Sequence, residues 1–294
     1  MSKPKSRQPK TKTPRTKLPS SWQLFRNSVS LLVNNWKLFG GITLVYGILT
    51  YLFVWSSGLG LDIVTLKSEL MNVFGQQANS LYIGLSLFTQ LVGGSAVNDQ
   101  VDSLYQTIIL VICSLAIIWA VRRVQEKPKT PPNLRQAFYS STYPLIPFLG
   151  VLFVMFVQLL PISLASALYL QVIVNGLAVT MREQIVWTLL IAVLSFISYY
   201  LISSSVFALY IVSLPNMAPI KSLKAASQLV KRRRLQVAVK FLWLGVILFV
   251  VFAGVTVPLI LVAPKFAQIV FLVMGLGVLP LAHSYIYNLY RSLL

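Results

Sequence analysis

The chain has 294 residues, of which 56% are apolar and only 11% are charged, and its mean hydropathy is +0.76. This composition excludes an ordinary soluble domain, whose surface is largely polar, and favours a protein that faces lipid. The net charge of +19 comes from 25 Lys and Arg residues against 6 Asp and Glu residues, and the single cysteine, Cys113, excludes an intrachain disulfide and a cysteine-based metal cluster.

The first 19 residues are rich in Lys, Arg, Pro, Ser and Thr and carry almost no apolar side chain. Such a segment cannot bury enough apolar surface to offset its chain entropy, so we expect a disordered basic cytoplasmic tail over residues 1–19. The tail has no aromatic side chain to stack on bases, so nucleic-acid binding is not expected. Residues 20–294 are expected to form one membrane domain.

Long apolar runs without Asp, Glu, Lys or Arg divide this domain. A helix needs roughly 20 apolar residues to cross the hydrocarbon core, and these runs are too evenly apolar for the alternating strands of a barrel. The predicted fold class is therefore all-α, a polytopic membrane bundle of six transmembrane helices. The first span is expected to be a retained anchor, because residues 55–58 make a poor signal-peptide cleavage site. The spans are predicted at residues 38–57, 104–121, 145–168, 186–211, 241–263 and 266–290.

Positive charge falls on every second connection between these spans. Nine Lys and Arg residues precede the first span, five lie between the second and third, seven between the fourth and fifth, and one follows the sixth. The opposite side holds only Lys67, Arg182 and Lys265, together with five of the six acidic residues. By the positive-inside rule, both termini are predicted to be cytoplasmic and the protein to lie in the cytoplasmic (inner) membrane.

An amphipathic segment precedes each odd-numbered span, which predicts three interfacial helices. Ser20 and Ser21 are candidate N-caps for the first. Together with the spans, the segments indicate three repeats, each an interfacial helix followed by a transmembrane hairpin, although chance similarity among apolar segments is an alternative. The apolar faces are predicted as Trp22, Phe25, Val29, Leu32, Val33 and Trp36 in the first helix, Leu134, Ala137, Phe138 and Ser141 in the second, and Ile220, Leu223, Ser227 and Val230 in the third.

The connection 58–103 is the one long loop on the predicted outer side. Residues 63–74 have the spacing of a short amphipathic helix, and residues 80–93 form an uncharged apolar segment too short to span comfortably. A seventh span there would place the basic run 231–234 outside, against the charge rule. We therefore expect residues 80–93 to form an interfacial or re-entrant cap.

Few side chains are available for catalysis, so the chain is not expected to be an enzyme. It has one His, one Cys and six acidic residues, five of them on the outer side, and it lacks a Walker-type phosphate loop. No cofactor or metal is expected. Of Asp, Glu, Lys, Arg and His, the usual functional residues of membrane spans, only His283 lies within a predicted span. It is therefore a candidate functional residue, with a neutral hydrogen-bonding role or an interface anchor as the alternative.

Polar residues and prolines within the spans leave a transporter or permease component as the alternative function. Pro161, Pro258 and Pro280 are expected to break helices, as happens around transporter sites. The polar side chains lack a charged midplane cluster and fit interhelical packing as well as a conduction path. They are Gln158, Asn175, Ser195, Ser198, Ser203, Ser204 and Ser205.

Basic clusters flank the predicted spans on the cytoplasmic side and are the candidate contact site. Lys and Arg near an anionic leaflet attract its headgroups, so anionic membrane lipids are the expected partners, with a protein partner or a homo-oligomer left open. A purely topological role for these charges is the alternative. The candidate residues are Lys221, Lys224, Lys231, Arg232, Arg233, Arg234, Arg122 and Arg123.

The stretch from Pro219 to Arg232, PIKSLKAASQLVKR, resembles a motif in the membrane domain found fused to some bacterial glycerophosphoryl diester phosphodiesterases and also in stand-alone proteins. There, a cytoplasmic helix with a Ser and a basic run introduces a membrane hairpin. The catalytic barrel with its acidic and His metal ligands has no counterpart here. The resemblance implies a membrane module without that activity, and the combined hypothesis is a non-enzymatic protein that organises or senses the envelope.

Overall fold

The computed structural model describes residues 18–54, 100–126, 132–174, 176–178, 180–214 and 217–294. Helix accounts for 89% of the structure, and these residues form no strand, which confirms the all-α prediction. Most of the predicted basic tail and of the loop 58–103, including both segments singled out in that loop, lies outside the described residues.

Six long helices are long and apolar enough to cross a membrane, which confirms the predicted number of spans among the residues described. Several extend beyond the apolar runs at the predicted cytoplasmic end; α10, for example, begins at Arg234 rather than at residue 241. Helix α7 ends in one π-helical turn, Leu170–Val174. The long helices are α2 (Trp36–Phe53), α5 (Gln100–Glu126), α7 (Leu145–Tyr169), α8 (Met181–Val212), α10 (Arg234–Val262) and α11 (Pro264–Leu293).

The three amphipathic segments are the short helices α1 (Ser21–Asn34), α6 (Leu134–Ser141) and α9 (Pro219–Val230). Each precedes a pair of long helices, so one order of elements occurs three times along the chain. The Ser20 side chain caps α1 by accepting a hydrogen bond from the Gln23 backbone amide at 3.2 Å, as predicted. A common repeat behind this order stays a prediction.

The face that each short helix turns inward agrees only in part with the prediction. Helix α6 buries Ala137 and Ser141 from its predicted face. Helix α1 instead buries Leu24 and Ser28, and its predicted apolar stripe is largely exposed. Leu24 and the small Ser28 let α1 pack closely against the protein. The apolar stripe points away from the protein, as in a helix that lies in a membrane interface. Its outward members include Trp22, Val29, Val33 and Trp36.

The predicted face of α9 is wrong for Ile220, which is 67% exposed. The helix buries Ser222, Ala226 and Val230, spaced four residues apart. These side chains are small, and apolar periodicity alone ranks the larger Ile220 above them. Packing at a close helix contact favours the small residues instead.

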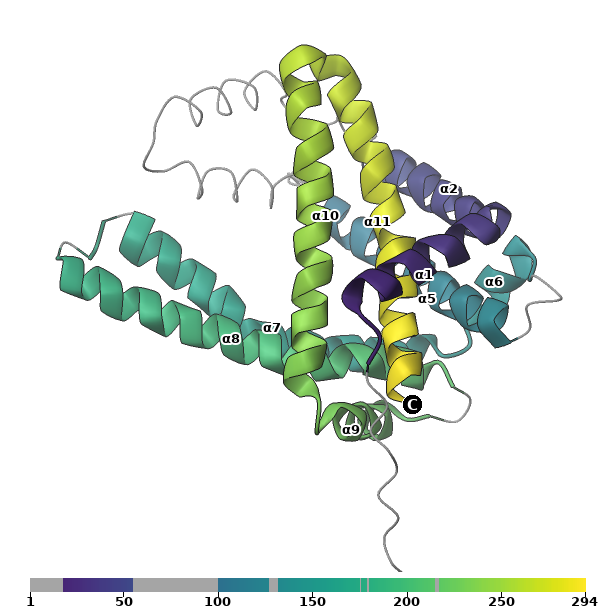
Figure 1. Cartoon of the computed structure of the whole chain (residues 1–294), viewed down its shortest axis with the longest axis horizontal. Helices are drawn as coiled ribbons and strands as arrows, with labels where there is room; N and C mark the ends of the chain where they lie inside the picture. The colour runs from purple at the N-terminus through teal and green to yellow at the C-terminus, as the bar shows by residue number, and fades with distance from the viewer. Residues whose placement is uncertain (1–17, 55–99, 127–131, 175, 179, 215–216) are drawn as a thin grey trace, which may run out of the picture.

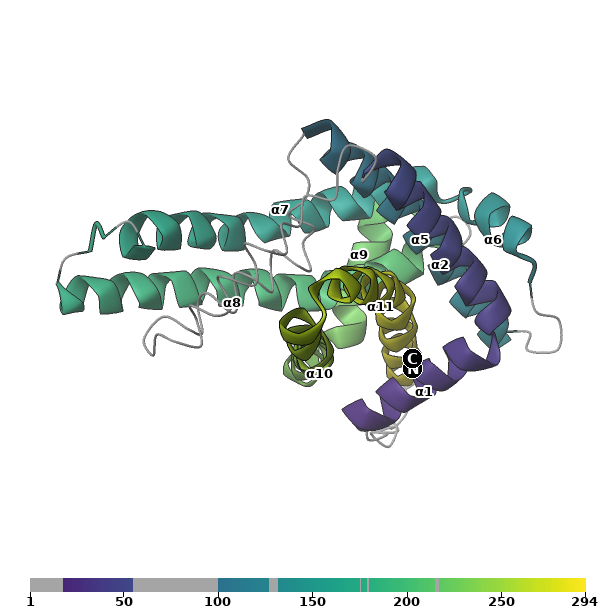
Figure 2. The same ribbon diagram turned by 90° about the horizontal axis from the view of Figure 1, so that it is seen from above.

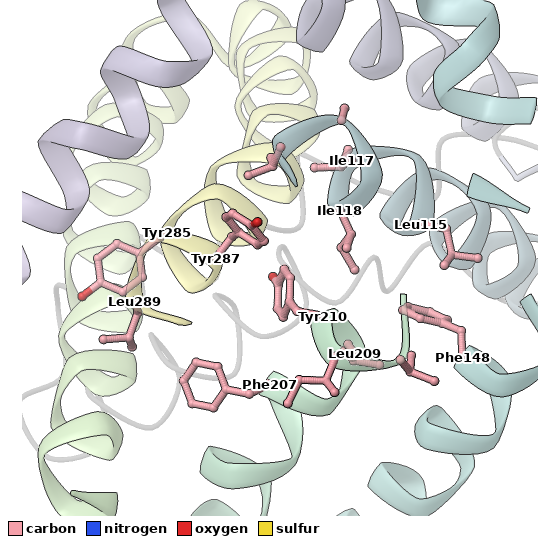
Figure 3. Close-up of a cluster of buried hydrophobic side chains, with 14 of the residues drawn as sticks. Leu115, Ile117, Ile118, Phe148, Phe207, Leu209, Tyr210, Tyr285, Tyr287 and Leu289 are labelled. Carbon is pink, nitrogen blue, oxygen red and sulfur yellow. The ribbon is translucent and has the colours of Figure 1, made fainter. Parts of the chain in front are cut away.

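One hydrophobic core contains residues from all six long helices. In each helix they lie toward the end that the charge pattern predicts to be cytoplasmic. Helix α5 lies at its centre and packs against α2, α6 and α11. The buried side chains of the core include Ile117 and Ile118 of α5, Phe207 and Tyr210 of α8 and Tyr285 of α11, which lie close together in Figure 3. The short helices also contribute to this core, α1 with Leu24, α6 with Ala137 and α9 with Ala226 and Val230.

Away from this core the helical hairpins diverge. Helices α7 and α8 lie side by side and project from the core across the direction of α10 and α11, as Figures 1 and 2 show together. Only 6% of the most apolar 18-residue segment of α8 is buried inside the protein, against 56% of the corresponding segment of α5. The outward side chains of α7 and α8 are mostly large and apolar, so this hairpin carries the surface expected of helices surrounded by lipid.

The three prolines within long helices do not break them, contrary to the expectation from the sequence. Pro161, Pro258 and Pro280 lie inside α7, α10 and α11, which continue past them. At Pro161 the disturbed backbone finds a new partner, because the Ile162 amide donates to the Ser198 hydroxyl of α8 at 3.0 Å. Hydroxyl side chains of neighbouring helices commonly compensate prolines in this way in membranes.

Gly150 of α7 and Gly245 of α10 predict opposite responses to alanine. A Cβ at Gly150 would lie 2.9 Å from Cγ of the rigid Pro219 ring, whereas a Cβ at Gly245 meets nothing within 4 Å. We expect Gly150→Ala to destabilise the protein by about 1–3 kcal/mol and Gly245→Ala to leave stability unchanged or raise it by up to about 1 kcal/mol. Thermal unfolding in detergent micelles measures both, and equal shifts would contradict the α7–α9 contact.

Candidate functional site

The candidate basic residues of the α9 region divide into an exposed set and an inward set. Helix α9 begins at Pro219, which suits the first helical position, and buries its small residues against the core. Its opposite face carries Lys221 and Lys224, which are exposed, and the turn that follows exposes Lys231 and Arg232. Four of the predicted contact residues therefore lie on one accessible surface.

Arg233 and Arg234 are half-buried, unlike these four, and the Nε atom of Arg234 is buried. The Arg234 Nη2 donates to the Ser227 hydroxyl at 2.6 Å, and its guanidinium lies 5.1 Å from the centroid of the Tyr200 ring. A cation over an aromatic face is attracted by the ring quadrupole, more strongly where water is excluded. Arg234 thus joins α9, α10 and α8 and is held for packing rather than for an external contact.

Arg122 and Arg123 are neighbours at the end of α5 but have different surroundings. The Arg122 Nε donates to Glu126 Oε1 at 2.8 Å, and its Nη1 donates to the Ser213 carbonyl at the end of α8 at 3.2 Å. Arg123 is exposed. Arg122 is therefore fixed between two helices, and Arg123 keeps its guanidinium accessible.

A pocket of about 200 Å³ opens beside these two arginines. It lies between the end of α5, the turn that joins α6 to α7, and the end of α8. One wall is apolar and aromatic, with Leu115, Trp119 and Pro144, and the rest is polar. The polar lining is Arg122, Arg123, Glu126, Ser140, Ser141, Tyr143 and Ser213.

A chain of side-chain hydrogen bonds, which the sequence analysis missed, joins α1 to α11 and α5. The Asn288 Nδ2 donates to Ser28 Oγ at 2.9 Å and the Gln125 Nε2 donates to Asn288 Oδ1 at 2.7 Å. The Arg291 Nη1 then donates to Gln125 Oε1 at 2.8 Å. Ser28 was visible as a polar residue near an apolar face, but its partner Asn288 is 260 residues away along the chain, so periodicity could not pair them. The chain fixes α1 against the core.

His283 has a hydrogen-bonding partner within the membrane domain. The Tyr210 hydroxyl lies 2.9 Å from His283 Nδ1 and 3.2 Å from the His283 carbonyl oxygen, to which it can donate. Tyr210 is buried in the core that joins α8 to α11. The contact supports the hydrogen-bonding interpretation of His283.

The serines of α8 bond within their own helix. Ser203 donates to the Tyr200 carbonyl at 2.8 Å, and Ser204 and Ser205 donate to the Leu201 carbonyl at 2.9 and 3.3 Å. All three side chains are buried, and none lines the pocket at the end of α5. This arrangement fits packing. Within the described part of the chain, no three His, Cys, Asp or Glu side chains gather in a way that could hold a metal ion.

Comparison of the chain with protein-family models, with curated proteins and with solved structures finds no match. The resemblance of the α9 region to the phosphodiesterase-associated membrane domain therefore stays a prediction.

The hydrogen-bond chain predicts that two serines of α1 differ in importance. Ser28→Ala removes the buried hydroxyl that accepts from the half-buried Asn288 amide, so we expect a loss of about 1–3 kcal/mol in the free energy of unfolding. Ser30→Ala on the exposed face serves as the control and is expected to change stability by less than about 0.5 kcal/mol. Thermal unfolding in micelles and the rate of tryptic cleavage after Arg26 report the docking of α1. Similar behaviour of the two variants would show that the hydrogen-bond chain does not hold α1 against the core.

The contact between Tyr210 and His283 predicts non-additive substitutions. Tyr210→Phe leaves Nδ1 of His283 without its partner, so the single change is expected to cost about 1–3 kcal/mol of stability. Adding His283→Leu is expected to recover about 1 kcal/mol relative to the sum of the single changes. Equilibrium unfolding of the two single variants and the double variant gives the coupling, and strict additivity would show that the two groups do not interact.

Proposed function

We propose that this chain is a non-enzymatic integral membrane protein of the cytoplasmic membrane that organises or senses the envelope. It acts through contacts of its cytoplasmic face with anionic lipids, and both termini lie on that side. The observation that carries the proposal is the exposure of Lys221, Lys224, Lys231 and Arg232 on one surface beside the shared core. A surface of this kind attracts negatively charged headgroups.

Aromatic side chains next to the same core support the interfacial placement. Trp22 near the start of α1 and Trp36 at the start of α2 are 60% and 67% exposed. Trp22 also stacks on Phe25, with ring centroids 5.8 Å apart, and meets the edge of Trp243 at 6.3 Å. Tryptophan favours the level of the lipid headgroups, where its ring is apolar and its N–H is wet. The exposed stripe of α1 therefore suits a helix that lies in the interface.

The alternative, a transporter or permease component, would need a water-accessible crevice lined by Ser203, Ser204, Ser205, Gln158 and His283. The three serine hydroxyls bond to their own helix, and His283 bonds to Tyr210. These contacts favour packing over a conduction path, so lipid contact is the function we put forward.

Neutralising the α9 surface tests the proposal. Purified protein is equilibrated with mixed vesicles of phosphatidylglycerol and phosphatidylcholine, and the lipids retained after extraction are quantified by mass spectrometry. We expect enrichment of the anionic lipid at physiological salt, weakened at high salt by screening. Replacing Lys221, Lys224, Lys231 and Arg232 by Gln should reduce it, by up to about fivefold for each cation that contacts the leaflet.

Arg182→Gln, at the start of α8 on the predicted outer side, is the control for a lost positive charge. It is expected to leave the enrichment unchanged. Equal retention of anionic and zwitterionic lipid by the unaltered protein would refute the proposed function.

A further inference from the structure

The pocket at the end of α5 has the size of a headgroup site rather than a site for a whole organic ligand. Its volume is about 200 Å³, below the range of about 300–1,000 Å³ that is common for ligand pockets. A compact polar group with a long apolar attachment outside the pocket fits this size.

The charge in the pocket favours an anion. Arg122 and Arg123 face one acidic side chain, Glu126, and the ion pair there uses Arg122. Among the described residues no carboxylate forms an ion pair with Arg123. Arg122 uses its Nε and Nη1 on Glu126 and Ser213, which fixes the plane of the guanidinium and leaves Nη2 for a ligand. Two guanidinium groups, one of them preoriented, suit the oxygens of a phosphate group.

The remaining lining distinguishes the two ends of the ligand. Ser140 and Tyr143 bring hydroxyl groups that can donate to phosphate or ester oxygens. Trp119 and Leu115 supply apolar lining, Tyr143 of the lining is 83% exposed, and Ile146 near the start of α7 is 82% exposed. Exposed aromatic and apolar side chains next to a charged pocket are typical of the membrane interface. The ligand is therefore expected to enter from the lipid side.

We propose that this pocket is a saturable site for one phosphate headgroup of an anionic phospholipid, bound by Arg123 and the free Nη2 of Arg122. The inference rests on the proposed function, because it names one specific lipid site within the broader anionic contact surface. It assigns Arg123 a direct contact and Arg122 both a structural contact and a ligand contact.

Arg123→Gln tests the site, with Arg135→Gln as its matched control. Both arginines are exposed, but Arg135 lies on α6 outside the pocket. Native mass spectrometry of the full chain in micelles, titrated with phosphatidylglycerol, is expected to show one tight lipid, with affinity about tenfold weaker in Arg123→Gln, the loss expected for one charge-assisted contact. Arg135→Gln should match the unaltered protein. Arg123→Lys, which keeps the charge but loses the planar fork, should fall between them.

Three outcomes would overturn the site. The first is equal affinity in Arg123→Gln and Arg135→Gln. The second is equally tight binding of phosphatidylcholine, whose headgroup is zwitterionic. The third is displacement of the lipid by millimolar inorganic phosphate, which would assign the pocket to a free anion. If Arg123→Gln and Arg135→Gln bind the lipid alike while neutralising the α9 surface still lowers anionic enrichment, only the pocket site is refuted. If the unaltered protein shows no preference for anionic lipid, the proposed function is refuted as well.

Discussion

The arrangement depends on packing between helix ends in a solvent that gives apolar helices little reason to associate. Lipid chains are as apolar as Leu side chains, so helices join in membranes through close packing and interhelical hydrogen bonds. Here those contacts concentrate at one end of each long helix, where Ala116 and Ala120 of α5 are fully buried and Asn288 links α11 to Ser28 and Gln125. The far parts of α7 and α8 pack against each other and stay apart from α10 and α11, as Figures 1 and 2 show.

Because the core joins the ends of the spans, it also determines where the charges gather. The Lys and Arg residues follow or precede the spans on the predicted cytoplasmic side, so bringing these ends together brings their basic turns together. The short helices α1, α6 and α9 pack against these ends. Helix α9 turns Lys221 and Lys224 outward, and α1 exposes much of its apolar stripe. The alternating charge pattern of the sequence thereby becomes, after folding, a set of basic turns beside this core.

Among the described residues, the sequence predicted the six long and three short helices in their order, because apolar length and helical periodicity are local properties of the sequence. The sequence predicted the ends of the helices less well, and Arg234 and Lys240 lie within α10. A helix continues past its apolar run wherever charged residues can reach water or a partner. The sequence also misjudged Ile220 in α9 and the prolines. Both errors concern neighbours distant in sequence, the close approach of α9 to the core and the Ser198 hydroxyl that serves Ile162. Hydropathy carries no information on either.

The candidate site shows the same division between local pattern and distant contact. Lys221 and Lys224 are exposed as the helical spacing predicts. The arginines differ in exposure according to the side chains and carbonyls that they contact, which the spacing does not reveal. Arg234 is held by Ser227 and Tyr200, and Arg122 by Glu126 and Ser213. A guanidinium fixed by protein contacts loses freedom before any ligand arrives, so it binds an additional acceptor at a lower entropic cost than an exposed lysine. Specific lipid recognition should therefore occur beside Arg122, and the lysines of α9 should contribute a less specific attraction.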